Sequence, residues 1–189
     1  PFCAAKGSTG GGPVLMMRSK LQAYRKRGRC MDQAAIVALL GKTALFGGLG
    51  DNDRAAIAQL IASYGPAVDS NRLADAADLW TEDGEYVVAG FGSHTGRGAL
   101  VDLLAAPHHQ QLLQDGCAHI LSAPSIAIDG EHATAVNYSV VLRHQADGYA
   151  PERVAANRWQ LAKIAGQWQV QQRSNALLDG SAAAPALLA

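Results

Sequence analysis

The most informative segment of the sequence is RVAANRWQLAKIAGQWQVQQRSNALL, residues 153–178. Two runs rich in β-forming residues flank Ala165-Gly166, an arrangement typical of a β-hairpin. Upstream, residues 133–144 alternate as a strand does, and one face of this strand collects Thr134, Val136, Tyr138, Val140 and Leu142. Residues 117–128 predict another strand, ended by the turn Asp129-Gly130. Because short turns join these strands, we expect them to pair antiparallel.

The residues before these strands predict helices. Asp51-Asn52-Asp53 is suited to cap a helix, and its apolar side chains recur at helical spacing: Ala56, Ile57, Leu60, Ile61, Tyr64 and Val68. Pro66 should kink or end this helix, because proline cannot donate a backbone hydrogen bond. A short second helix is expected from Ser70-Asn71 to Trp80, and a third over residues 99–114, broken at Pro107. Between them, residues 85–89 predict a strand and residues 90–98 a glycine-rich loop.

This order of elements predicts an α+β fold, in which three helices cover one face of a curved antiparallel sheet. Three parts follow from the composition: a basic N-terminal extension over residues 1–50, a domain over residues 51–178 and a flexible tail over residues 179–189. The first part holds eight basic residues and one acid, whereas residues 51–189 hold eight basic residues and fifteen acids. The basic extension is interpreted as a solvated arm in preference to a nucleic-acid arm, and the acidic charge of the domain argues against nucleic-acid binding.

The remaining composition narrows the class of protein. The chain has 189 residues, of which 49% are hydrophobic and 17% charged, so it can form a core and is not of the disordered type. Near the N-terminus no apolar run approaches the ~20 residues of a membrane span. Three cysteines without C-x-x-C spacing predict neither a disulfide framework nor a zinc site. We therefore expect a cytoplasmic protein without a membrane association.

Several short segments, in this order and spacing, resemble the nuclear transport factor 2-like superfamily, and within it the SnoaL-like and scytalone-dehydratase-like branch. They are Tyr64 with Asp69, Leu79-Trp80-Thr81-Glu82-Asp83-Gly84, Gly96-Arg97-Gly98-Ala99-Leu100, Ala118-His119-Ile120, Ile126-Ala127-Ile128-Asp129-Gly130, Ala133-Thr134-Ala135 and Gly166-Gln167-Trp168. The resemblance implies a cone-shaped fold, in which the sheet wraps around a pocket closed by the helices. Family members include dehydratases, isomerases, cyclases and pure binding proteins, so the fold does not decide the function.

The same resemblance proposes three catalytic residues. It implies that His119 is a pocket histidine able to exchange a proton, that Asp69 orients it, and that Tyr64 donates to a substrate oxygen. From the residues alone each has a structural alternative: His119 as a satisfied strand-edge histidine, Asp69 as a cap of the second helix, and Tyr64 as a core aromatic. Trp80, Asn137 and Arg158 are predicted to bind the substrate.

Some features depart from the dehydratase pattern. Val140-Val141 stands where some dehydratases carry another acid, and Ala176-Leu177-Leu178 where some carry an arginine. Arg143, Arg158 and Arg173 lie on strands and could reach the pocket, but alternation cannot settle which face each occupies. His108-His109 with His119 is a poor metal triad because adjacent histidines rarely bind one ion. We expect no metal and no cofactor.

Two functions are compatible with these observations. One is a cofactor-independent lyase or isomerase that acts on a small, largely apolar molecule of polyketide or steroid type through a His-Asp pair. The other is a non-catalytic ligand-binding or subunit-interaction module of the same fold, which the missing acid and arginine favour. In either case a homodimer is expected through the outer face of the sheet, where Tyr138, Val140 and Leu142 gather.

Overall fold

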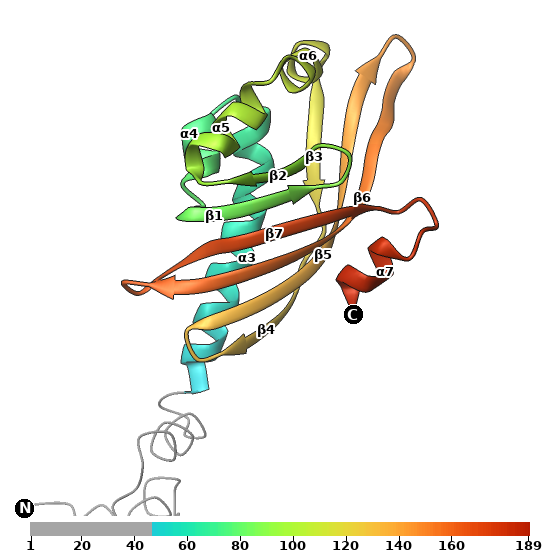
Figure 1. The fold of residues 1–189 in the computed structure, drawn as a ribbon. Helices are drawn as coiled ribbons and strands as arrows, with labels where there is room; N and C mark the ends of the chain where they lie inside the picture. Colours follow the sequence, from blue (N-terminus) through green and yellow to red (C-terminus); the bar gives the residue numbers. More distant parts are fainter. Residues whose placement is uncertain (1–46) are drawn as a thin grey trace, which may run out of the picture. The chain divides into compact units, whose positions relative to one another are not determined.

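The computed structural model describes residues 47–189, and expectations on residues 1–46 lie outside that range. Two pairs of helices and a pair of strands precede a run of five strands and a last helix, as Figure 1 shows. The helices are α3 (Gly47–Asp69), α4 (Leu73–Ala77), α5 (Arg97–Ala105), α6 (Pro107–Asp115) and α7 (Ala183–Leu188). The strands are β1 (Trp80–Val88), β2 (Gly92–Thr95), β3 (Cys117–Leu121), β4 (Ser125–Asp129), β5 (His132–Gln145), β6 (Gly148–Ile164) and β7 (Gln167–Leu177). Residues 53–189 form one compact unit.

The strands form one curved sheet in the order β2-β1-β7-β6-β5-β3, and β4 also pairs with β5. The expected hairpin is confirmed: β6 and β7 pair from Ile164 and Gln167, around Ala165 and Gly166 at positive φ. The α+β class is confirmed as well, but the sheet is mixed rather than purely antiparallel, because β1 pairs parallel to β7. The short-turn argument could not reach this pair, since most of the domain separates the two strands in the sequence.

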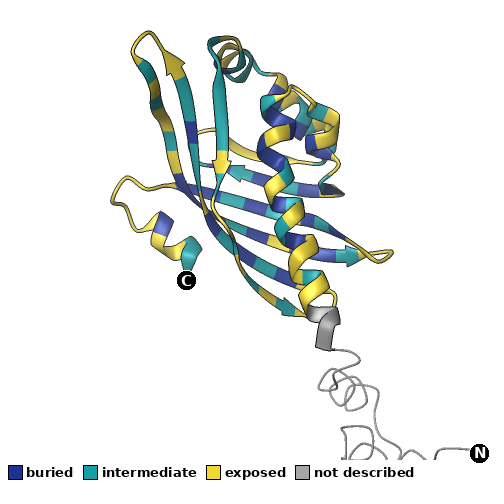
Figure 2. Ribbon diagram, turned by 180° about the vertical axis from the view of Figure 1, so that it is seen from behind, coloured by how far each residue is buried: buried dark blue, intermediate teal, exposed yellow. Residues whose placement is uncertain are grey.

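Helix α3, from Asp53 onwards, lies across the concave face of the sheet (Figure 2). It buries Ile57, Ile61, Tyr64 and Val68, which recur every three or four residues and so share one face. They pack into a core that also contains Trp80, Trp159, Leu161 and Val170. Burying one such side chain contributes about 1.5–3 kcal/mol, so this helix–sheet contact is a principal source of stability.

Pro66 lies inside α3 and does not end it. The helix continues to Asp69, and the backbone N–H of Ser70 still donates to the carbonyl of Pro66. Proline removes one donor of its own, and the following residues keep theirs. Of the two expected effects of Pro66, the end of the helix is therefore wrong and a kink remains a prediction; the C-terminal turn of α3 carries Asp69 towards β3.

Four other expectations on local structure are corrected. Helix α4 begins at Leu73 with Arg72 as its N-cap, and Trp80 begins β1 instead of ending a helix. The glycine-rich loop contains the short strand β2. The predicted strand over residues 117–128 is two strands, with Pro124 in the break between β3 and β4. The break at Pro107 is confirmed, because proline occupies the first turn of α6.

The C-terminal segment, for which we expect a flexible tail, contains a helix in the structure. Helix α7 packs on the outer face of the sheet, where Ala184 lies against Ala156 and Ala176. Leu187 and Leu188 extend this small apolar cluster. Small alanine side chains on the strands allow the close approach of the helix.

Among residues 47–189, no helix is long and apolar enough to cross a membrane.

Candidate functional site

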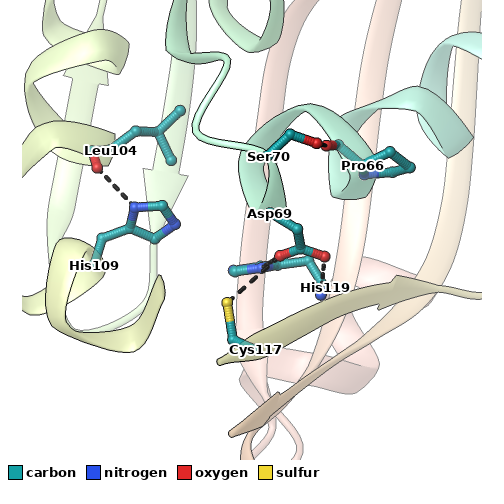
Figure 3. A network of polar contacts seen from close by, with 7 residues as sticks. All are labelled: Pro66, Asp69, Ser70, Leu104, His109, Cys117 and His119. Atoms are coloured by element: carbon teal, nitrogen blue, oxygen red, sulfur yellow. Dashed lines mark hydrogen bonds and ion pairs between the residues drawn. The ribbon is translucent and has the colours of Figure 1, made fainter. Parts of the chain in front are cut away.

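Asp69 and His119 are held together by two hydrogen bonds (Figure 3). The imidazole Nδ1 lies 2.6 Å from Asp69 Oδ1, and the backbone N–H of His119 donates to Asp69 Oδ2 over 2.8 Å. A carboxylate accepts, so Nδ1 carries the proton that it shares with Asp69. In the neutral imidazole the lone pair is then on Nε2, which makes no hydrogen bond within residues 47–189 and is not among their buried unpaired atoms.

Gly65 explains why helix and strand come close enough for this pair. A Cβ at position 65 would lie 2.2 Å from the carbonyl oxygen of His119, far inside a normal contact. Only glycine permits the backbone of α3 to approach β3 this closely. The end of α3 therefore delivers Asp69 directly to His119.

The charge of Asp69 is stabilised where it sits. Burial acts to raise the pKa of Asp69, but the hydrogen bonds from His119 outweigh it and hold the pKa below its ordinary value. The thiol of Cys117 also donates to Asp69 Oδ1, over 3.6 Å. Burial and the neighbouring carboxylate raise the pKa of Cys117 to about 11, so the thiol keeps its proton at neutral pH.

These three residues are also the one group in the described part of the chain that could be drawn as a metal site. The ligand atoms of Asp69, Cys117 and His119 lie within 4.8 Å of one another. However, the carboxylate and the imidazole already hydrogen-bond each other, and a protonated thiol is a poor ligand because metals bind the thiolate. The donor set thus suits a hydrogen-bonded pair better than an ion, and the absence of a metal remains a prediction.

His119 lines a cavity of about 130 Å³ between the helices and the concave face of the sheet. An apolar cavity of about 150 Å³ can hold benzene, so the space suits a small, ring-sized group. Its apolar wall includes Leu104, Leu112, Leu121 and Val141. The cavity therefore places His119 beside an apolar wall.

A second histidine, His109 on α6, faces the same cavity. Its ring centre lies 5.7 Å from that of His119, and its Nδ1 lies 2.7 Å from the carbonyl oxygen of Leu104. The carbonyl can only accept, so Nε2 of His109 is left as an acceptor, and this buried atom has no partner among the described residues. Burial lowers the pKa of His109 and favours the neutral ring.

Two arginines complete the polar part of the cavity wall. Arg153 on β6 and Arg173 on β7 both line it, together with Tyr64 and Tyr86. Arg173 has an exposed fraction of 2%, and its guanidinium carbon lies 4.4 Å from the ring centre of Tyr64. Burial raises the pKa of Tyr64 well above its ordinary value, so its phenol is neutral and can donate a hydrogen bond.

Of the three residues predicted to be catalytic, His119 and Tyr64 line the cavity, and Asp69 bonds to His119. Asp69 and His119 bond directly, and Asp69 does not cap α4, which starts from Arg72 without a side-chain cap. Tyr64 lies one turn before Asp69 on α3 and packs edge-on against Trp80 and Trp159. Its ring lies against the guanidinium of Arg173, and both residues line the cavity.

The three residues predicted to bind the substrate lie elsewhere. Trp80 is fully buried in the core, and Asn137 joins Trp159 Nε1 to the carbonyl of Ser122. Arg158 donates to the carbonyl of Leu187 on α7. None of the three lines the cavity, since the core and the outer face of the sheet take up their side chains.

The polar residues that do line the cavity were only partly accessible to sequence reasoning. Arg173 was one of three candidate arginines, but Arg143 instead pairs with Asp115 and Glu152. Arg153 and Asn175 were missed, and His109 was considered only as a metal ligand. Arg153 could have been found because it stands an even number of residues before Trp159, and residues so spaced share a face of a strand.

Comparisons with known proteins agree with this architecture. The model of the SnoaL-like domain matches residues 52–174, and the chain belongs to that family. An NTF2-like protein with a cystatin-like fold from Novosphingobium aromaticivorans is 40% identical, with a TM-score of 0.73, and the match covers 85% of this chain and 99% of that one. No curated protein sequence matches this chain.

More distant solved structures share the fold alone. A protein of unknown function from Mycobacterium tuberculosis is 24% identical with a TM-score of 0.61, covering 71% of this chain and 76% of that one. A hexachlorocyclohexane dehydrochlorinase, LinA-type3 from Novosphingobium barchaimii, is 18% identical with a TM-score of 0.59, covering 67% of this chain and 87% of that one.

Proposed function

We propose that this protein is a cofactor-independent enzyme that moves a proton on a small, largely apolar substrate, in a dehydration, isomerisation or cyclisation. One observation carries the proposal: Asp69 holds His119 with Nδ1 protonated, so that the lone pair of Nε2 is available at an apolar cavity. A histidine held in this way can act as a general base.

In a dehydration, the residues would have the following roles. His119 Nε2 takes a proton from a carbon next to a carbonyl, and the C–H electron pair forms the new double bond. The adjacent C–O bond breaks as the imidazolium returns the proton, and the hydroxyl leaves as water. Asp69 stabilises the imidazolium without itself taking the proton. Atoms and electrons balance without an oxidant or a reductant.

The substrate oxygen would meet hydrogen-bond donors at the other end of the cavity. Tyr64, whose phenol is neutral, and Arg173 both line the cavity, and the guanidinium lies over the Tyr64 ring. A donor aimed at an oxygen that gains negative charge stabilises the transition state, by about 2.7–4 kcal/mol for one such group. The apolar wall strengthens this interaction because it keeps the local dielectric low.

A non-catalytic binding module remains the second candidate, and one observation favours it. Among the cavity residues the structure describes, Glu152 is the only acid, and it pairs with Arg143. The site therefore offers no second carboxylate for acid–base work. The experiment below separates the two candidates.

The test is hydrogen exchange at the acidic carbons of 2-tetralone in D₂O, followed by NMR. An enzymatic base should accelerate exchange above the rate in buffer. His119→Gln should abolish the acceleration, whereas His132→Gln, at an exposed histidine that begins β5, should retain it. Equal exchange in the presence and absence of protein, or in wild type and His119→Gln, would favour the binding module.

The remaining expectations on partners stay proposals. A homodimer through the outer face of the sheet is supported by the exposed apolar side chains of Ile120 (51%), Tyr138 (49%) and Val154 (39%). They lie near one another, because Ile120 and Val154 both pair with Val140. Sedimentation at micromolar concentration tests it, and a monomeric mass contradicts it. The ligand class, a small apolar or polyketide- or steroid-like molecule, and the cytoplasmic location also remain predictions.

A further inference from the structure

Arg173 is an arginine held in place by a neutral partner. Its Nε and Nη2 both donate to Asn157 Oδ1, over 3.1 Å and 2.8 Å. Its Nη1 is buried and has no hydrogen-bond partner within residues 47–189. An unpaired buried donor on a charged group is costly unless a ligand satisfies it.

Aromatic rings surround the same guanidinium. Its carbon lies 4.3 Å from the ring centre of Trp159, 4.4 Å from that of Tyr64 and 4.7 Å from that of Tyr86. The faces of such rings attract a cation, so they explain how the charge is tolerated in the interior. They are uncharged, however, and leave Nη1 without a hydrogen bond.

Arg153, which lines the same cavity, also has an unpaired nitrogen within the described part of the chain. Its Nη2 donates to the carbonyl of Ala89 over 2.6 Å and to Asn175 Oδ1 over 3.0 Å. Its Nε is buried and unpaired within the described residues. Burial lowers the pKa of Arg153, and the neighbouring charge of Arg173 acts in the same direction, although Tyr86 and Tyr64 oppose it.

No carboxylate of residues 47–189 forms an ion pair with either arginine. The ion pairs within that range engage other cations, and Glu152 at the cavity wall is taken by Arg143 at 3.2 Å. Two guanidinium groups thus share one cavity, oriented by the amides of Asn157 and Asn175. Buried charges are normally paired, so this end of the cavity is short of an anion.

We propose that Arg153 and Arg173 form a binding subsite for a carboxylate, and that the substrate is a small cyclic or aromatic carboxylic acid. The carboxylate accepts from the free Nη1 of Arg173 and the free Nε of Arg153, while the ring fills the apolar part of the cavity. Because it names the substrate class of the same site, the inference rests on the proposed function, but its test measures binding and needs no turnover.

The experiment compares acids with their uncharged amides. Benzoate, phenylacetate and 3-phenylpropanoate are titrated against benzamide, phenylacetamide and 3-phenylpropanamide at millimolar concentration, by ligand-observed NMR. At least one acid should bind about tenfold or more tightly than its amide, as expected for a hydrogen bond to a charged group. The proposal is overturned if no acid is preferred, including the case in which none binds.

Substitutions test whether the two arginines cause the preference for acids over amides. Arg173→Met and Arg153→Gln should each remove most of it, and two variants are needed because the fully buried Arg173 also supports the core. Arg72→Gln, at an exposed arginine paired with Asp75, is the matched control and should leave it unchanged. A preference that survives in both cavity variants overturns the proposal.

One further variant separates this inference from the proposed function. His119→Gln should abolish exchange on 2-tetralone and keep the preference for acids, since the base and the anion subsite are different groups. An acid preference in a protein that exchanges no protons would leave the subsite standing and reject the enzyme. Proton exchange without an acid preference would support the enzyme and reject the carboxylate subsite.

Discussion

Gly65→Ala is the substitution for which the structure makes the sharpest prediction. The new methyl carbon would lie 2.2 Å from the carbonyl oxygen of His119, where an ordinary contact begins at 3.4 Å. Helix and strand must therefore separate by about 1.2 Å. The bond between Asp69 Oδ1 and His119 Nδ1 is 2.6 Å long, and a shift of that size along it would exceed the range of a hydrogen bond.

Two opposing effects decide the sign of the change in stability. Alanine is favoured over glycine inside a helix by about 0.8–1.0 kcal/mol. Forcing an extra methyl into a packed contact costs about 1–3 kcal/mol, or more where the neighbour is backbone and cannot rotate away. We expect the clash to dominate, so that Gly65→Ala lowers the free energy of unfolding and also impairs proton exchange on 2-tetralone.

The assay is denaturant unfolding, with Gly98→Ala as the matched control. Gly98 also lies in a helix, α5, but a Cβ there would meet nothing within 4 Å. Gly98→Ala should therefore be neutral or stabilising. If Gly65→Ala is as stable as Gly98→Ala and keeps its activity, the close approach of α3 to β3 does not exist and the reasoning is refuted.

Three further predictions concern charge, packing and the chain ends. The folded-state pKa of Asp69 lies below its ordinary value of 3.8, so the contribution of its carboxylate to stability is present above about pH 4 and is lost as the pH falls further. The free energy of unfolding should therefore fall more steeply with acid in wild type than in Asp69→Asn. Equal slopes would contradict this. Asn137→Ala should lower the free energy of unfolding by about 1–3 kcal/mol, because it leaves buried groups unpaired. Binding of the phenyl acids should stay unchanged. A loss of binding with unchanged stability would show instead that Asn137 binds the ligand. Residues 53–189 alone should unfold cooperatively, and removal of residues 179–189 should destabilise them by exposing Ala156 and Ala176; chemical denaturation of both fragments decides it.

The sequence predicted those parts of the fold that depend on local patterns. The hairpin at Ala165-Gly166 and the break at Pro107 follow from turn chemistry and the geometry of proline, and both were found at the expected residues. The parallel pairing of β1 with β7 could not be predicted in this way, because it joins distant segments through no turn. Local sequence contains no signal for such a contact.

Arg173 shows why the candidate site was harder to predict than the fold. Trp168 and Val170 point into the core, so strict alternation would continue inward at Gln172 and outward at Arg173. The pairing of β6 with β7 shifts by one residue between Gln160 and Leu161, which turns Arg173 to the interior. One extra residue in a strand reverses the face of every residue beyond it, and the sequence does not mark the position of this bulge.

The Asp69–His119 pair was predicted from the resemblance to a family rather than from spacing. The two residues are 50 positions apart, and their contact depends on Gly65, which the sequence presents as an ordinary glycine next to a proline. A glycine needed for close approach looks no different from one in a turn until the partner backbone is known. The structure therefore supplies what the resemblance did not, namely the close backbone approach that brings the two residues together.

A double-mutant cycle on proton exchange tests whether Asp69 acts through His119. Exchange rates on 2-tetralone are measured for His119→Gln, Asp69→Asn and the double variant. Since the carboxylate matters only by setting the tautomer and charge of the imidazole, adding Asp69→Asn to His119→Gln should cause no further loss. A double variant whose loss is the product of the two single losses would show that the two residues act independently and that Asp69 does not act through His119.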